Sequence, residues 1–305
     1  MLVKAAAETW KVPESECKAV LGTVKHEKSR RSLTYGQLCE KAAPLEIPKD
    51  PPLKKEEEFR YMGKPMPRID VPEKVSGKAI YGLDVTMKDL HYAVIARPPA
   101  YGAKPISFDQ KGAEQVKGVV KVMQMPQGIA VCATTTEAAL KGREALKVQW
   151  DKGTHPDMNN ASIEKLMMED LDKPGAKVHE AGDVQKALSE AVKKVEATYY
   201  IPCVAHVTME PMNTTAFVQE DRCDLWTPTQ NQTACKAMAA GLTKLPPEKI
   251  HVHTTFLGCG LGRRAFNDFL SEAVILSKEL KKPVKVMWTR EDDILQDRFR
   301  APMTH

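Results

Sequence analysis

Apolar residues along this 305-residue chain fall into two patterns. Short apolar runs bounded by Gly, Pro, Asp or Asn are typical of β-strands, and longer segments with apolar residues every three or four positions are typical of amphipathic helices. The two kinds of segment follow one another in mixed order, without an internal repeat. The pattern therefore predicts an α+β fold in which helices cover the faces of sheets.

Residues 1–43 predict a small helix and hairpin segment. Its first helix should end at Pro13, because proline cannot continue a helix interior. Residues 20–24 and Leu33 are then expected to pair as short strands across the charged loop 27–31. Thr34 and Gln37 have the spacing of a capping box, in which two side chains satisfy free amides at the start of a second helix.

The proline-rich residues 44–68 predict an extended connector, because proline fixes φ and removes a backbone donor. Residues 69–151 then predict a domain of short strands with one helix, which is capped by Thr134 to Thr136 and ends near Leu146. The strands of this domain are predicted over 79–85, 91–96, 119–123, 129–133 and 147–150.

Residues 152–196 predict a helical linker, with one helix around 163–171 and another that Asp183 caps and that extends to about Val195. Residues 197–305 return to mixed strands and helices. Their strands are predicted over 198–207, 214–219, 223–226, 250–256 and 284–288, and their helices over 232–241 and 264–279.

Composition argues against several classes of partner. The 45 basic and 40 acidic residues are mixed along the chain, with no basic stripe interleaved with aromatics, so we expect no nucleic-acid partner. No apolar run approaches the ~20 residues of a transmembrane helix, so no transmembrane segment is expected.

Seven scattered cysteines form no CxxC pair, which argues against a disulfide framework or a structural zinc site. No secretory signal follows Met1, so the chain would be cytoplasmic if Met1 is its natural start.

The stretch GCGLGRRAFNDF, which begins at Gly258, is the most unusual in the chain. Three alternating glycines between a strand and a helix let successive N–H groups converge on an anion. A dinucleotide loop is the alternative, but its fingerprint is G-x-G-x-x-G and this stretch reads G-x-G-x-G. A bare tight turn is the simplest interpretation, and Arg263 and Arg264, which follow the glycines, favour contact with an anion or cofactor over it.

Two histidine patterns could ligate a metal, and neither is strong. His206 and Glu210 would share a face only on a helix, and Pro211 argues against a helix there. Glu210 is then better placed near the end of a strand, or in a solvated loop. His251 and His253 lie on one face of a predicted strand, without an evident third ligand.

Two polar clusters complete the candidates. Gln230 follows a predicted strand and could present its amide to a ligand while Thr229 caps the next helix, although simple capping explains both. Arg298 and Arg300 could clamp a carboxylate or phosphate near the glycine loop. The acidic run that starts at Glu291 is more simply interpreted as charge that complements a helix dipole.

Together, these segments resemble the molybdenum hydroxylases, the xanthine dehydrogenase and aldehyde oxidase family. The ordered motifs are RIDVPEKVSGKA at 68–79, MEPMN at 209–213, WTPTQ at 226–230, GCGLGRR at 258–264, and TRED with RAP at 289–292 and 300–302. The MEPMN and GxGxGRR forms are most similar to the subfamily that includes the beta subunit of isoquinoline 1-oxidoreductase and bacterial aldehyde dehydrogenases. The resemblance implies a hammerhead-type mixed α/β domain over 69–151, followed by the first part of a molybdopterin-binding domain over 197–305.

The resemblance also implies a molybdenum–pterin cofactor in its cytosine dinucleotide form. The cofactor-binding residues would be Gln230, Gly260, Leu261, Gly262, Arg263 and Arg264. Gln230 would lie near the apical oxygen ligand of the metal, and the amides of Leu261 and Gly262 would border its oxygen ligands. Glu210 and Arg300 would stand near the cofactor or the substrate channel. No residue of this chain is expected to ligate the metal directly.

The implied chemistry is hydroxylation of an aromatic N-heterocycle or an aldehyde, a small-molecule substrate, with oxygen derived from water. Electrons would leave through an iron–sulfur partner subunit with a [2Fe-2S] cluster, and the remainder of the large subunit would be a second partner. Relatives are often exported in folded form, so a periplasmic location is expected if the chain is cut from an exported precursor.

The chain departs from the family pattern at two points. Cys259 and Leu261 stand where we expect glycine and phenylalanine in G-G-G-F-G-R-R, and a β-carbon at 259 should restrict the turn. The glutamate base of a late G-E-P-G-type motif is absent from these 305 residues, so we expect no catalytic residue here and no activity from this chain alone. The alternatives are a noncatalytic fragment of such a subunit and, through the glycine loop, an NAD-dependent oxidoreductase.

Overall fold

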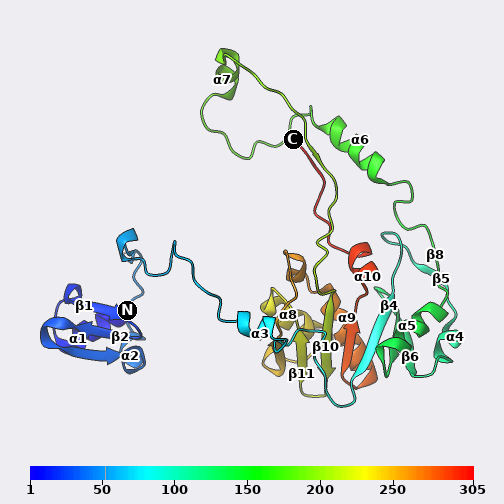
Figure 1. Cartoon of the computed structure of the whole chain (residues 1–305), viewed down its shortest axis with the longest axis horizontal. Coiled ribbons are helices and arrows are strands. Elements are labelled where there is room, and N and C mark those ends of the chain that lie inside the picture. The colour runs from blue at the N-terminus through cyan, green and yellow to red at the C-terminus, as the bar shows by residue number, and fades with distance from the viewer. Residues whose placement is uncertain (52) are drawn as a thin grey trace. The chain divides into compact units, whose positions relative to one another are not determined.

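The computed structural model describes residues 1–51 and 53–305, which form two compact units, Met1–Asp70 and Val71–His305 (Figure 1). The first unit packs two helices against a three-stranded antiparallel sheet. Its elements are α1 (Leu2–Trp10), β1 (Cys17–Val20), β2 (Thr23–His26), β3 (Arg31–Thr34) and α2 (Tyr35–Ala42). Val24 and Leu38 are fully buried between them. The predicted capping box of Thr34 and Gln37 begins α2, and this prediction is confirmed.

The predicted pairing of the 20–24 segment with Leu33 is confirmed at Val24, which lies opposite Leu33 in the β2–β3 pair. Residues 20–24 do not form one strand, however. β1 ends at Val20 and β2 begins at Thr23, and these two residues pair directly across the hairpin. Leu21 and Gly22 between them have φ of 47° and 77°. Two positive φ values in succession are typical of a two-residue hairpin turn, which reverses the chain in the middle of the apolar run.

The second unit is built on a mixed seven-stranded sheet (Figure 1). In spatial order its strands are β12 (Ile250–Thr254), β11 (Cys223–Thr227), β10 (Asn213–Val218), β13 (Val284–Met287), β4 (His91–Ala96), β7 (Gly128–Ala133) and β6 (Val119–Met125). β13 pairs in parallel with β4. Strands from the predicted segments 69–151 and 197–305 therefore share one sheet.

The second unit also contains helices and short strands outside this sheet. The helices are α3 (Val71–Val75), α4 (Gln110–Glu114), α5 (Thr136–Ala145), α6 (Asn160–Asp170), α7 (Val184–Glu190), α8 (Gln232–Thr243), α9 (Asp268–Leu280) and α10 (Arg290–Leu295). The short strands are β5 (Pro105–Ser107) paired with β8 (Gln149–Trp150), and β9 (Tyr200–Ile201) paired with β14 (Met303–Thr304). Among the described residues, no helix is both long and apolar enough to cross a membrane.

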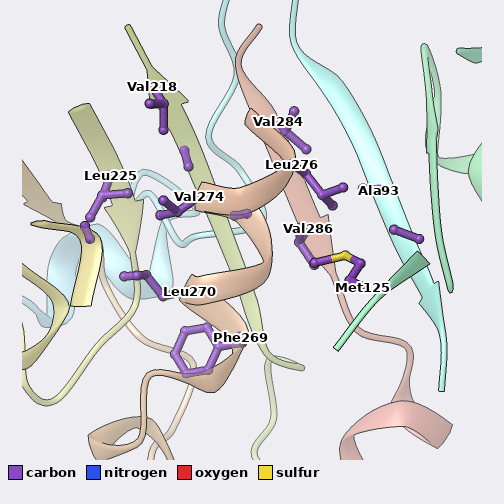
Figure 2. Close-up of a cluster of buried hydrophobic side chains, with 14 of the residues drawn as sticks. Ala93, Met125, Val218, Leu225, Phe269, Leu270, Val274, Leu276, Val284 and Val286 are labelled. Atoms are coloured by element: carbon purple, nitrogen blue, oxygen red, sulfur yellow. The ribbon is translucent and has the colours of Figure 1, made fainter. Parts of the chain in front are cut away.

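Helix α9 buries one apolar face against the sheet (Figure 2). Phe269, Leu270 and Val274 of α9 are fully buried, as are Leu225 of β11 and Val286 of β13. Each such side chain contributes about 1.5–3 kcal/mol by leaving water. Because α5 packs on the opposite face of β4 and β7, these two strands are apolar on both sides. This packing positions the loop between β12 and α9, which carries the candidate site.

Three sequence predictions fail in this unit. Residues 79–85, all of them described, form two successive turns and a single bridge from Tyr81 to Phe256 instead of a strand. The strand expected over 198–207 is reduced to β9, because its one strand partner is the short β14. The helix expected over 264–279 begins at Asp268, since the residues before it form a 3-10 turn.

Candidate functional site at the glycine loop

The glycine loop, residues 258–262, has positive φ at three of its five residues. Cys259, Leu261 and Gly262 have φ of 73°, 52° and 98°, so two of the three positive-φ residues carry a β-carbon. A non-glycine residue in this region costs about 1 kcal/mol or more. The expectation that a β-carbon at 259 restricts the turn therefore has a direct physical basis in the structure.

Gly258 and Gly260 have a different role, because each allows a neighbouring side chain to approach the loop backbone closely. A β-carbon on Gly258 would lie 2.5 Å from the Cβ of Glu210, and one on Gly260 would lie 2.7 Å from Oε1 of Gln230. Such contacts are far inside van der Waals distance. The two glycines thus let the loop lie directly against the side chains of Glu210 and Gln230.

The loop presents free backbone donors. Among the described residues, no acceptor pairs with the N–H groups of Cys259, Gly260, Leu261 or Gly262. Leu261 is 57% exposed. Successive unpaired amides in a tight turn can form a concavity that attracts anions and oxygen ligands. The arrangement supports the anion-binding interpretation of the glycine loop.

Both carboxylate oxygens of Glu210 are engaged inside the protein. Oε1 accepts from the backbone N–H of Leu83 at 3.2 Å and from Nδ2 of Asn213 at 2.8 Å. Oε2 accepts from the N–H of Gly258 at 2.9 Å and lies 3.4 Å from Nη2 of Arg264. Glu210 is 7% exposed. Its carboxylate therefore joins segments that are far apart in the sequence.

Arg264 is fully buried beneath the loop. Its Nε donates to the carbonyl oxygen of Cys259 at 2.8 Å, and its Nη2 donates to the carbonyl oxygen of Glu210. Burial lowers the pKa of Arg264, and the Glu210 carboxylate opposes that shift. The guanidinium thus connects the glycine loop to the turn that carries Glu210.

Arg263 is also fully buried, on separate partners. Its amino groups donate to the carboxylate of Asp268 at 2.9 and 3.1 Å, and its Nε lies 2.9 Å from Oδ1 of Asp297. The guanidinium lies over the ring of Trp288. The guanidinium groups of Arg263 and Arg264 are therefore buried against partners inside the protein. A ligand at this loop would contact the backbone of these residues rather than their charged groups.

Gln230 and Arg300 contact the loop with exposed side chains. The backbone N–H of Gln230 donates to the carbonyl oxygen of Arg264 at 3.1 Å, which seats its side chain against Gly260. Nη2 of Arg300 donates to the carbonyl oxygen of Leu261 at 2.8 Å. Among the described residues, Arg300 has no carboxylate partner. The structure therefore brings these two predicted residues to the edge of the free amides.

Two of the three histidine candidates, His206 and His253, lie against carboxylates. Nδ1 of His206 lies 3.1 Å from both oxygens of Asp297, and Nε2 of His253 lies 2.8 Å from Oδ1 of Asp224. His253 also stacks on Trp226, with ring centroids 4.8 Å apart. In the described part of the chain, no group of three or more His, Cys, Asp or Glu residues is arranged to hold a metal ion.

The predicted cap of the helix after Gln230 needs correction. Asn231, not Thr229, caps α8, because its side chain accepts from the N–H of Ala234. The Thr229 hydroxyl instead accepts from the N–H of Asn231 at 3.0 Å. Thr229 faces inward at the end of β11, where it is almost fully buried.

The acidic run at α10 does more than complement a helix dipole. Asp292 completes a capping box with Thr289 and also pairs with Arg143 of α5 at 2.8 Å. Asp293 pairs with Arg290 at 2.7 Å, while burial raises the pKa of Asp293 and Arg290 opposes the shift. The Asp293–Arg290 pair is local to α10, three positions apart. Sequence reasoning missed the pair with Arg143, because nothing local to α10 indicates which distant arginine reaches it.

Comparisons with known proteins show what the chain is similar to. Residues 169–305 match the molybdopterin cofactor-binding domain. The chain is 30% identical to isoquinoline 1-oxidoreductase subunit beta of Brevundimonas diminuta, with 99% of this chain and 44% of the relative covered. It is 32% identical to a membrane-bound aldehyde dehydrogenase of Gluconacetobacter polyoxogenes that is named for pyrroloquinoline quinone, with 82% and 34% covered.

A solved structure shows the same fold. The aldehyde oxidoreductase of Desulfovibrio gigas aligns with a TM-score of 0.62 at 17% identity, over 77% of this chain and 31% of that one. The chain spans less than half the length of the curated relatives described above. What is similar is therefore one part of longer proteins, and it includes the glycine loop.

Proposed function

Since this chain belongs to the molybdenum hydroxylase family, we propose that it forms the part of a molybdenum-cofactor-binding subunit that faces the oxygen ligands of the metal. The observation that carries the proposal is the row of free amides from Cys259 to Gly262. These donors lie within the stretch that matches the molybdopterin cofactor-binding domain. Oxygen ligands that carry negative charge are suited to such a concavity.

The donor set around the loop fits this cofactor. The amides of Leu261 and Gly262 would donate to the oxygen ligands, and the carboxamide of Gln230 would donate to one of them from the side of Gly260. Arg300 would add a positive charge at the same edge. When bound, the cofactor would supply oxygen derived from water and take up electrons from the substrate. The cytosine dinucleotide form is part of this proposal, and it rests on the motif resemblance.

The substrate we propose is an aromatic N-heterocycle or an aldehyde. The names of the two curated relatives, an isoquinoline oxidoreductase and an aldehyde dehydrogenase, support this class. A [2Fe-2S] subunit would receive the electrons, and the general base would come from the remainder of the large subunit. Glu210 does not supply that base in this conformation, because both of its oxygens already accept hydrogen bonds.

The glycine loop does not support a nicotinamide site. A dinucleotide fold places the start of a helix directly after its glycines, where the helix N-terminus meets the pyrophosphate. Here a 3-10 turn over Arg263–Ala265 follows the loop, and α9 begins only at Asp268. The helix N-terminus is therefore displaced from the free amides.

Metal and cofactor analysis of the natively purified complex tests the proposal. We expect molybdenum and a pterin that releases cytidine monophosphate on acid hydrolysis. A complex that contains pyrroloquinoline quinone and no molybdenum would overturn the proposed function. A complex with molybdenum and a pterin that lacks the cytidine nucleotide would overturn only the proposed cofactor form.

A further inference from the structure

We propose that Glu210 is a positioning residue, which holds the glycine loop in its anion-binding conformation before any cofactor is present. The inference rests on the proposed function for the role of the loop, and on the contacts of this chain for the role of Glu210. The motif resemblance implied that Glu210 stands near the cofactor or the substrate channel. The proposal gives it a different role, which is to support the glycine loop.

Glu210 hydrogen-bonds to the first residue of the loop through both its backbone and its side chain. Its N–H donates to the carbonyl oxygen of Gly258 at 2.9 Å, and its Oε2 accepts from the N–H of the same glycine at 2.9 Å. The missing β-carbon of Gly258 is what permits this approach, since that atom would fall 2.5 Å from the Cβ of Glu210. Both polar groups of the Gly258 backbone are thereby directed at one residue.

Arg264 adds hydrogen bonds to the next residue of the loop. It donates to the carbonyl oxygens of Cys259 and Glu210, and its Nη2 lies 3.4 Å from the Glu210 carboxylate. Glu210 and Arg264 together fix the carbonyl groups of residues 258 and 259. With those carbonyls directed inward, the amides that follow are left free for a ligand.

The loop needs such support because its conformation is unfavourable on its own. Cys259 and Leu261 adopt positive φ without being glycine, and the amides from 259 to 262 have no partner among the described residues. A free loop would relax toward negative φ and pair its amides. Burial of the Glu210–Arg264 pair makes the support hard to replace, because loss of one partner leaves the other charge buried and unpaired.

Selective labelling makes the proposal testable on the 305-residue chain without cofactor. The chain has 17 glycines, so ¹⁵N-glycine labelling yields a simple spectrum in which Gly258, Gly260 and Gly262 report on the loop. In Glu210→Gln the carboxylate becomes an amide, and its charge is lost. We expect the resonances of Gly260 and Gly262 to shift or broaden, and the affinity of the loop for inorganic molybdate to fall about tenfold or more, as loss of a charged hydrogen bond implies.

Glu272 offers a matched control for the loss of a buried ion pair. It is 1% exposed and accepts two hydrogen bonds from Arg97, at 2.6 and 2.8 Å, without touching residues 258–262. We expect Glu272→Gln to lower the melting temperature while the loop resonances and molybdate affinity stay unchanged. Folded Glu210→Gln protein with unchanged Gly260 and Gly262 resonances would overturn the positioning role.

A second pair of variants applies if Glu210→Gln does not fold. Gly258→Ala pushes a β-carbon against Glu210 and should move the Gly260 and Gly262 resonances, whereas Gly241→Ala in α8 meets no atom within 4 Å and should not. Unmoved resonances in Gly258→Ala would also overturn the positioning role. The proposed function has a separate test. If molybdate shifts no glycine resonance of the wild-type chain, that result counts against the proposed function. It leaves the role of Glu210 untouched, because that role is judged from the spectra of the chain without molybdate.

Discussion

Arg300 and Leu261 are joined by one hydrogen bond, from Nη2 of the arginine to the carbonyl oxygen of the leucine at 2.8 Å. This bond holds an exposed guanidinium at the edge of the free amides of the glycine loop. A β-carbon on Gly262 would lie 3.7 Å from the same Nη2. The loop and the arginine therefore form one electropositive edge, although 39 positions of sequence separate them.

Replacement of Arg300 should weaken anion binding at the loop. Arg300→Gln removes the charge, and we expect the affinity of the chain for molybdate to fall about tenfold, because a charged hydrogen bond contributes roughly 1.5–3 kcal/mol. The molybdate affinity of Arg300→Lys should lie between those of the wild type and Arg300→Gln, since lysine keeps the charge without the planar fork of the guanidinium. Isothermal titration calorimetry at two salt concentrations measures both. Arg298→Gln is the control, because Arg298 pairs with Asp268 at 3.4 Å and not with the loop.

Replacement of Cys259 by glycine should stabilise the second unit. Cys259 has φ of 73°, which glycine adopts without steric penalty, so Cys259→Gly should raise the free energy of unfolding by about 1 kcal/mol. Thermal denaturation by circular dichroism measures the shift. Ala237→Gly, at an exposed position inside α8, should change stability by a similar amount in the opposite direction. A loss of stability in Cys259→Gly would contradict the strain at this position.

A β-carbon at Gly82 should be severely destabilising. It would lie 2.1 Å from Oδ1 of Asn213 and 2.7 Å from Cδ of Pro228, both in buried surroundings. Gly82→Ala should therefore cost about 2–3 kcal/mol, as overpacking of a tight site does. Gly241→Ala has open space and should be neutral or slightly stabilising, because alanine favours the helix. Urea unfolding of both variants separates the two effects.

Asp224 should make the stability of the sheet edge depend on acid pH. Burial alone would raise the pKa of Asp224, but hydrogen bonds from Arg222 and His253 bring it below the usual 3.8. Since the folded pKa is depressed, the stabilisation is present above about pH 4 and is lost as the pH falls through the folded pKa. Asp224→Asn should lower the melting temperature at pH 7 and flatten its decline toward acid. A variant that keeps the wild-type slope would contradict this assignment.

Much of the second unit follows from local pattern. β4 occupies the predicted residues 91–96, and the predicted strands 119–123 and 129–133 lie within β6 and β7. β4 and β7 are apolar on both faces, so their composition alone distinguishes them from the polar loops around them. Residues 79–85 look equally apolar, yet they turn. Their backbone is bound by Glu210 and Phe256, which no local pattern reveals.

The candidate site divides in the same way. The sequence by itself determined that residues 258–262 form a glycine-rich loop, because alternating glycines before two arginines are a local and rare pattern, and it predicts an anion there. Only the tertiary structure decided what each residue does. Gly258 and Gly260 make room for Glu210 and Gln230, while positive φ falls on Cys259 and Leu261. Such roles depend on which side chains arrive from distant segments, and burial and hydrogen bonding across the fold determine that.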